Sequence, residues 1–161
     1  MQASRILPDL QCSLVCEEVR QEANGNFFLI GVINYIRVPK LPITALRLTV
    51  YNRWTAGIGQ FNETVRLVAP DQTTEMRKAE TKFQLPDPGM HATNVAIFGQ
   101  IEFTTAGHYY IEVLVDDVMK IRYPLTVILQ PPPEGKGRPG QPPAQAPEKP
   151  DTPDQSQPPN G

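Results

Sequence analysis

The stretch ALRLTVYNRW, residues 45–54, decides the fold class because apolar and polar side chains alternate along it. The residues on the apolar parity are Leu46, Leu48, Val50 and Trp54. A period of two is typical of a strand with one dry and one wet face, whereas a helix repeats every 3.6 residues. The stretch therefore predicts a half-buried strand, with Trp54 in the core or at its rim.

The same alternation recurs on both sides of this stretch. Phe61, Val65 and Leu67 share one parity in residues 61–69. Residues 94–103 place Phe98 on one parity and four apolar residues on the other, namely Val95, Ile97, Ile101 and Phe103. Turn signals separate these runs. We expect about eight strands, at 11–19, 26–33, 44–54, 60–69, 74–84, 92–103, 108–115 and 119–129.

Many short strands with regular turns predict an all-β fold, an antiparallel β-sandwich or barrel. Residues 74–84 could also form a helix. Lys78, Glu80 and Lys82 share one parity there, which favours an edge strand that carries charges against aggregation.

Proline divides the chain into two parts. Eleven of its 18 prolines follow Gln130, and the last apolar run ends at Leu129. We expect a β-sandwich domain at 1–130 and a disordered, Pro-rich tail at 131–161 that serves as a spacer or solubilising segment. A motif in the tail, Lys136-x-x-Pro139-x-x-Pro142, also matches ligands of Pro-binding domains.

Charge and hydropathy exclude several functions. The net charge is −2 with both signs scattered, so nucleic-acid binding has no electrostatic support. Residues 1–161 contain no apolar run long enough for a membrane span. Cys12 and Cys16 would lie about 13 Å apart on one strand, too far for a disulfide. We read them as small core residues of a cytoplasmic protein.

The first hairpin is predicted from Asn24-Gly25, a strong signal for a two-residue turn. Such a turn pairs Val19 with Ile30. Cys12, Leu14 and Cys16 then lie on the opposite parity from Val19, so one strand cannot bury both sets. We expect a β-bulge or strong twist near Glu17-Glu18.

Asp116-Asp117 separates two apolar rows within residues 109–127. The rows meet on one side of a hairpin if its loop has an odd length, either 116–118 or 115–119. The first loop pairs Val113 with Ile121. We therefore interpret the aspartates as a bend, and the alternative is a calcium site completed by Glu17-Glu18.

The sequence contains little evidence for a catalytic or metal-binding site. His91 and His108 are the only histidines, no spacing resembles a zinc site, and Ser13 lies in no hydrolase motif, so we assign no catalytic residue, metal ligand or cofactor. The glycosylation pattern Asn62-Glu63-Thr64 is treated as a chance match. Tyr35, Tyr51 and Tyr110 are candidate binding residues if they share an outward face.

The segment CEEVRQEANGNFFLIGVINYIRVP, residues 16–39, resembles a family of small uncharacterised bacterial proteins. The shared features are the acidic pair, Val19-Arg20, the Asn-Gly turn, Leu29-Ile30-Gly31 and the link to Pro39, and similarity extends over most of residues 10–129. The chain departs from the family pattern at two places, with glutamates as the acidic pair and Asp117 in place of a glycine. The resemblance implies an immunoglobulin-like sandwich and carries no assigned activity.

These observations favour a non-enzymatic protein-interaction or structural module with an unknown protein partner. One alternative is an accessory module that binds a carbohydrate or peptide through the tyrosines. Another is a metal-dependent hydrolase, which needs several polar side chains from different loops in one pocket.

Overall fold

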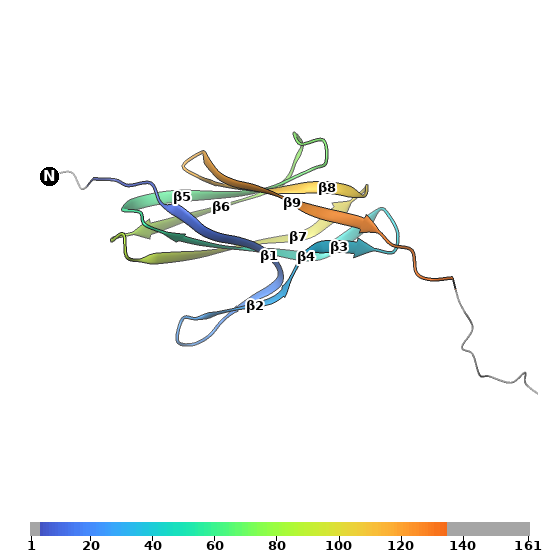
Figure 1. Ribbon diagram of the computed structural model, residues 1–161, viewed down its shortest axis with the longest axis horizontal. Coiled ribbons are helices and arrows are strands. Elements are labelled where there is room, and N and C mark those ends of the chain that lie inside the picture. Colours follow the sequence, from blue (N-terminus) through green and yellow to red (C-terminus); the bar gives the residue numbers. More distant parts are fainter. Residues whose placement is uncertain (1–3, 135–161) are drawn as a thin grey trace, which may run out of the picture.

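Two facing sheets make up the computed structural model, which describes residues 4–134 (Figure 1). The first sheet has the order β2 (Phe27–Val32), β1 (Asp9–Gln21), β4 (Ile43–Thr55) and β7 (His91–Phe103). The second has the order β3 (Tyr35–Val38), β9 (Val118–Leu129), β8 (Gly107–Val115), β5 (Gly59–Val68) and β6 (Glu75–Leu85). All eight expected strands are present, and β3 is an additional strand of four residues.

The order of the strands confirms an immunoglobulin-like sandwich. Strands β1, β4 and β7 are neighbours in one sheet, as are β5, β8 and β9 in the other. These two sets match the A-B-E and C-F-G arrangement of that fold. The hydroxyl of Tyr109 donates a hydrogen bond of 2.8 Å to the carbonyl oxygen of Thr105. This is the tyrosine corner that marks the start of strand F in such domains.

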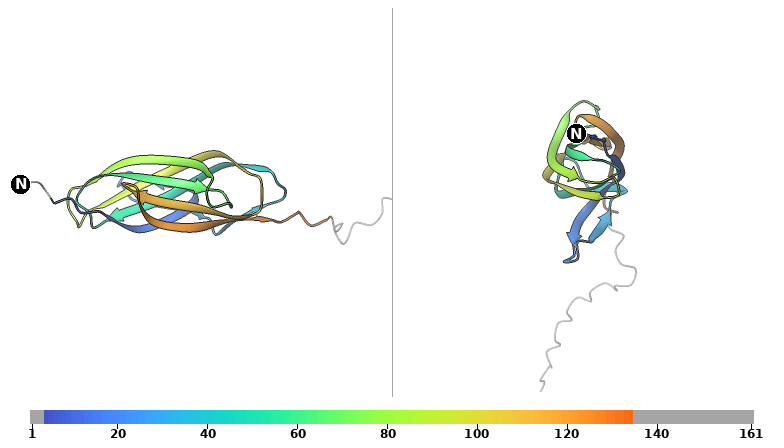
Figure 2. Two further views of the ribbon diagram at one scale, coloured as in Figure 1. Left: turned by 90° about the horizontal axis from the view of Figure 1, so that it is seen from above. Right: turned by 90° about the vertical axis from the view of Figure 1, so that its left-hand side faces the viewer.

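One pair of strands corrects the expectation of a purely antiparallel arrangement. Strand β3 runs parallel to β9, with Tyr35 opposite Thr126 and Val38 opposite Leu129. All other pairs of the named strands are antiparallel. The pair attaches an early segment to the last strand, at the end of the sandwich where the described chain leaves it (Figures 1 and 2).

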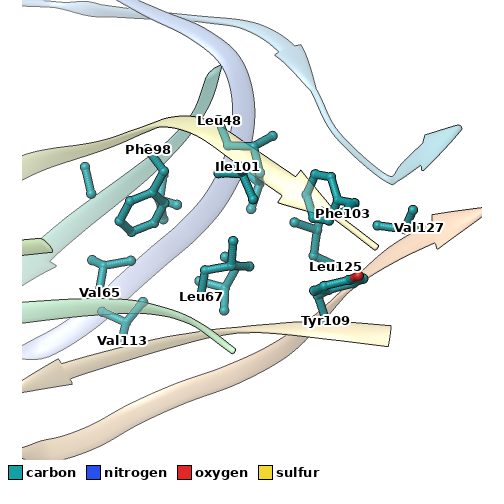
Figure 3. Packing of buried hydrophobic residues seen from close by; sticks show 14 of the residues in the cluster. Leu48, Val65, Leu67, Phe98, Ile101, Phe103, Tyr109, Val113, Leu125 and Val127 are labelled. Carbon is teal, nitrogen blue, oxygen red and sulfur yellow. The ribbon is translucent and has the colours of Figure 1, made fainter. Parts of the chain in front are cut away.

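Apolar side chains from both sheets fill the space between them (Figure 3). Leu48 and Phe98 come from the first sheet, and Val65, Val113 and Leu125 come from the second. Trp54 is fully buried, as predicted. Sandwich cores of this kind are built from alternating inward residues of both sheets.

The facing of β7 differs from the prediction in its first half. Asn94, Ala96 and Phe98 are buried, whereas Ile97 is 56% exposed. Ile101 and Phe103 are buried, as the alternation predicted. The facing changes between Phe98 and Ile101, where Gln100 has a φ of 50°. A single alternation could not reveal this change, because it depends on one left-handed residue.

Strand β6 confirms the predicted charged edge. It lies at the end of the second sheet, and Lys78, Glu80 and Lys82 are on its solvent-facing side. No helix in the described part of the chain is long and apolar enough to cross a membrane. The tail predicted at 131–161 lies outside the described residues from position 135 onward.

Candidate functional site

The three candidate tyrosines do not form a common face. Tyr51 lies on the outer side of the first sheet, is 8% exposed and packs edge-on against Phe27 at 5.7 Å. Tyr110 lies on the outer side of the second sheet, beneath the guanidinium of Arg122. Tyr35 is half exposed on the edge strand β3. Tyr35 and Tyr110 both lie on the outer side of the second sheet, because Tyr35 is opposite Thr126 of β9 and its neighbour Ile36 packs against the core. Tyr51 lies on the other sheet, so no single face carries all three tyrosines.

The aspartate pair is a bend, and its loop is shorter than predicted. Val115 pairs with Val118, so Asp116 and Asp117 alone form the turn, with φ values of 45° and 65°. Two consecutive residues with positive φ are the signature of a type I′ turn. The predicted pairing of Val113 with Ile121 is present.

A β-bulge in the hairpin supplies the extra residue that the predicted loop of odd length would have contained. The register shifts after Val113, because Leu114 pairs with Met119 and leaves Lys120 as the extra residue. A β-bulge of this kind places two residues opposite one. The apolar rows can thus share a parity although the loop has an even length.

The Asp116 carboxylate has protein partners. It accepts a hydrogen bond of 2.9 Å from the backbone N–H of Asn62 and forms an ion pair with Arg5. Arg5 also donates to the carbonyl oxygen of Gln60 and lies 4.7 Å from the ring centre of Phe61. Glu17 and Glu18, the other suggested calcium ligands, lie on β1 in the opposite sheet. Asp116 therefore connects the turn to β5 and to the N-terminal segment.

The three residues considered for a hydrolase site are also separated. Ser13 shares a hydrogen bond of 2.9 Å with Tyr123, and His108 one of 2.9 Å with Thr126. His91 lies opposite Thr55 at the start of β7. No pair among Ser13, His91 and His108 makes contact through these bonds, so they form no catalytic arrangement.

The first hairpin has a longer loop than the two residues predicted. Glu22 N–H donates to Asn26, Gly25 N–H donates to Glu22, and Gly25 has a φ of 91°. The register is consequently one residue off the prediction, with Val19 opposite Leu29. A turn followed by a left-handed glycine is the usual geometry of a three-residue hairpin loop, here residues 23–25.

The bulge expected near Glu17 is absent. The register of β1 against β2 is unchanged from Cys16 to Glu18, and the shift in β1 lies between Leu10 and Cys12. Gly31 lies opposite Glu17 and has a φ of 63°. A Cβ at Gly31 would lie 2.7 Å from the carboxyl carbon of Glu17. The backbone irregularity at this position is therefore the left-handed Gly31 on β2, and not a bulge in β1.

The two cysteines are free thiols. Cys16 is fully buried and Cys12 is partly buried, but neither belongs to the main core, which takes Val15 from this strand. Burial, followed by the proximity of Cys12, raises the pKa of the Cys16 thiol. Burial therefore favours the neutral thiol form of Cys16.

Apolar side chains are exposed along β2, which we call the hairpin edge and define by Phe28, Ile30 and Val32. Their exposed fractions are 54%, 39% and 47%. Strand β2 ends its sheet, and the hairpin extends away from the body of the sandwich (Figures 1 and 2). The hairpin edge therefore combines an open strand with an apolar row.

A groove of about 330 Å³ lies between the tip of this hairpin and the outer side of the first sheet. Phe27 and Tyr51 line it on the aromatic side, and Arg53 and His91 supply basic groups. Arg53 makes no ion pair within residues 4–134. The groove is open and polar, and it suits a carboxylate better than an apolar ligand.

A cluster of polar side chains is buried between the sheets, and we call it the Glu63 cluster. It consists of Glu63 on β5, Asn52 and Trp54 on β4, and Asn94 on β7, none of them more than 6% exposed. Trp54 Nε1 donates a hydrogen bond to Glu63 Oε2. Burial raises the pKa of Glu63, and hydrogen bonding from Trp54, Asn52 and Asn94 lowers it to a smaller extent.

The sequence carries a signal for this cluster that our alternation patterns did not use. Glu63 has the parity of Phe61 and Val65, and Asn52 has the parity of Val50 and Trp54. A polar residue on the dry parity of a strand predicts a buried polar group. Asn94 could not be found in this way, because the facing of β7 was assigned wrongly there.

Comparisons with known proteins were made against families, curated proteins and solved structures. No curated protein matches the chain significantly. Among 38 matching chains of solved structures is an immunoglobulin-like protein from Pseudomonas aeruginosa. The identity is 16% over 78% of this chain and all of that chain, and the TM-score is 0.36. A family model described as "Family of unknown function" matches residues 11–128, so the chain belongs to that family, DUF6941.

Proposed function

We propose that this protein is a non-enzymatic interaction module that binds a protein partner through the hairpin edge. The observation that carries the proposal is the alternating row of Phe28, Ile30 and Val32, which is 39–54% exposed on a terminal strand. Contiguous exposed apolar residues on soluble proteins are common at interaction sites.

The contrast with β6 supports this proposal. Both strands end a sheet, but β6 carries Lys78, Glu80 and Lys82, whereas β2 (FFLIGV) has no charged residue. Charges on an edge strand prevent association with other strands. Of these two terminal strands, β6 is protected by its charges and β2 is suited to contact.

The groove beside the hairpin adds a polar contact for the same partner. Arg53, with no ion pair within the described residues, can bind a carboxylate in a bidentate manner. A partner with an apolar segment flanked by an acidic side chain fits both features. Two free thiols agree with a cytoplasmic location, which is part of the proposal.

The test compares three forms of the full chain in quantitative affinity purification: wild type, Phe28→Thr/Val32→Thr, and the control Ile97→Thr. Ile97 is 56% exposed on β7, away from the hairpin edge. Threonine retains β-propensity, so the hairpin should persist. We expect a protein that wild type and the control enrich and that the double variant loses by about tenfold, the change that 1.4 kcal/mol of binding free energy produces.

The enriched protein is then purified and titrated against all three forms by calorimetry. Direct binding that weakens only in the double variant supports the proposal. Equal binding by the double variant, or specific turnover of a substrate by the purified chain, would overturn it.

A further inference from the structure

Strand β2 has an open side that no described strand covers. It ends the first sheet, so only β1 pairs with it within residues 4–134. Glu22 N–H donates to Asn26 at the start of the hairpin, and the bonding residues of an antiparallel pair alternate from there. Phe28 therefore bonds to β1, whereas the N–H and C=O groups of Phe27 and Leu29 point to the open side. These groups can pair with one further strand.

The side chains of β2 are complementary to a second copy of the same strand. Phe27–Val32 contains no charged residue, and Phe28, Ile30 and Val32 are 39–54% exposed. When two such strands pair antiparallel around a two-fold axis at Leu29, Phe28 lies opposite the partner's Ile30. An aromatic side chain beside a β-branched one is a favourable cross-strand pair, and the symmetry forms it twice. In this register the outward backbone groups of Leu29 meet those of the partner's Leu29, as hydrogen bonding requires.

The Glu17 carboxylate lies against this open strand. Glu17 is on β1 opposite Gly31, and a Cβ at Gly31 would be 2.8 Å from Glu17 Oε2. The acid therefore reaches across the backbone of β2 at the position where the strand has no side chain. Glu17 makes no ion pair within residues 4–134. Its carboxylate is consequently able to bind a basic group of a second molecule.

The groove beside the hairpin supplies such a basic group. Arg53 lines it together with Phe27, and Arg53 likewise makes no ion pair among the described residues. Alternate residues of a strand share a face, so Phe27 is on the same face of the hairpin as Gly31 and Glu17. The two-fold axis at Leu29 brings the partner's Gly31 opposite Phe27. The partner's Glu17, which lies over that glycine, is then beside Arg53. Opposite charges meet in both directions, which favours a second copy over an unrelated strand.

We propose that the partner of the hairpin edge is a second copy of this chain, bound by antiparallel pairing of the two β2 strands, with Glu17 of each copy against Arg53 of the other. This inference rests on the proposed function and names its partner. The pairing joins the two first sheets into one continuous sheet and covers the open side of both β2 strands.

Sedimentation velocity of the full chain over a dilution series tests the charge contact. The forms compared are wild type, Glu17→Lys, Arg53→Glu and the control Glu102→Lys. Glu102 is exposed on β7, the strand that ends the same sheet on the other side. Wild type and the control should dimerise with the same dissociation constant. Each of the other two variants should dimerise about tenfold more weakly, because like charges then face each other in both contacts.

A mixture of the two weakened variants separates a charge contact from a damaged hairpin. In a mixed dimer of Glu17→Lys with Arg53→Glu, each of the two contacts again joins opposite charges. Equal amounts of these variants should therefore associate as tightly as wild type. Two hairpins that had merely lost their structure would not restore each other in this way.

Amide hydrogen exchange tests the strand pairing in the unmodified chain. The amides of Phe27 and Leu29 should exchange at least about tenfold faster well below the dissociation constant of the dimer than well above it, because only the dimer gives them a partner. The amide of Phe28, which bonds to β1, should be protected at both concentrations.

The outcomes distinguish this inference from the proposed function. A chain that is monomeric at every concentration, a dimer that is equally tight in both charge variants, or no restoration in the mixture would overturn the second copy as partner. If a different protein is then enriched by wild type and lost by Phe28→Thr/Val32→Thr, the proposed function stands with that protein in its place. If nothing is lost by the double variant, both fail.

Discussion

Glu112 shows how a buried acid can remain charged on the outer side of a sheet. It pairs across the strands with Arg66 on β5 and Arg122 on β9, and its side chain is only 7% exposed. Each arginine is about one third exposed, which keeps the basic groups hydrated. Charge-assisted hydrogen bonds that exclude water are stronger than those at an open surface.

Glu112→Gln should therefore lower the free energy of unfolding by about 1–2 kcal/mol, because Arg66 and Arg122 lose their shared anion. Urea denaturation at neutral pH measures the change. The matched control is Glu80→Gln, which removes an exposed pair with Lys78 and should change stability by no more than about 0.5 kcal/mol. Equal losses in the two variants would contradict this account of Glu112.

At the residue scale, the sequence predicted burial where alternation was unbroken. Trp54 and Val65 follow the pattern and are buried. Ile97 fails because one left-handed residue, Gln100, separates two halves of β7 that face different ways. The burial of Glu63 could have been predicted, since Glu63 has the parity of the core residues on its strand. Its partners on β4 and β7 could not, because they depend on how the two sheets are stacked.

At the element scale, the turn between β8 and β9 contains two aspartates that should affect stability in opposite directions. Asp116 accepts from Asn62 N–H and pairs with Arg5. Asp117 has the larger positive φ, and the described residues show no bond or ion pair of its side chain. Positive φ favours glycine in both turn positions.

Replacement by glycine should therefore act in opposite directions at these neighbouring positions. Asp117→Gly should raise stability by about 0.5 kcal/mol, because it relieves backbone strain. Asp116→Gly should lower stability by about 1 kcal/mol, because the loss of the carboxylate outweighs that relief. Thermal unfolding of both variants tests the assignment, and shifts of the same sign would refute it.

The elements themselves were largely predictable, and their connections were less so. Alternation and turn residues located eight of the nine strands, and β3 was missed because four residues are too few for a periodic pattern. The register of the first hairpin was displaced by one residue, because Gly25 lengthens its loop. The second hairpin has a shorter loop than predicted but keeps the predicted pairing of Val113 with Ile121, because Lys120 is an extra residue beside the loop. Such positions depend on local backbone geometry that residue type alone does not determine.

At the scale of the whole molecule, the described strands form two sheets that share one core. Beyond β9, a hydrogen bond of 2.8 Å joins Gln130 N–H to the carbonyl oxygen of Val38. All nine described strands and their core lie before this point. A domain boundary at residue 130 stays a prediction.

A chain that ends at Gln130 should unfold at the same temperature as the full chain, within about 2 °C, because no residue of the core is removed. Differential scanning calorimetry makes the comparison. A chain that ends at Val118 is the control and should not fold, since it lacks β9 and Leu125 of the core. A large fall in the first chain would show that the domain extends further.

The parallel pairing of β3 with β9 has a consequence for biosynthesis. A ribosome releases β3 early, whereas the strand that completes its sheet is among the last described segments to emerge. Domains fold as their sequence becomes available during translation. The second sheet of the nascent chain therefore stays incomplete during most of translation. Chaperone protection should matter most before Leu129 has left the ribosomal exit tunnel.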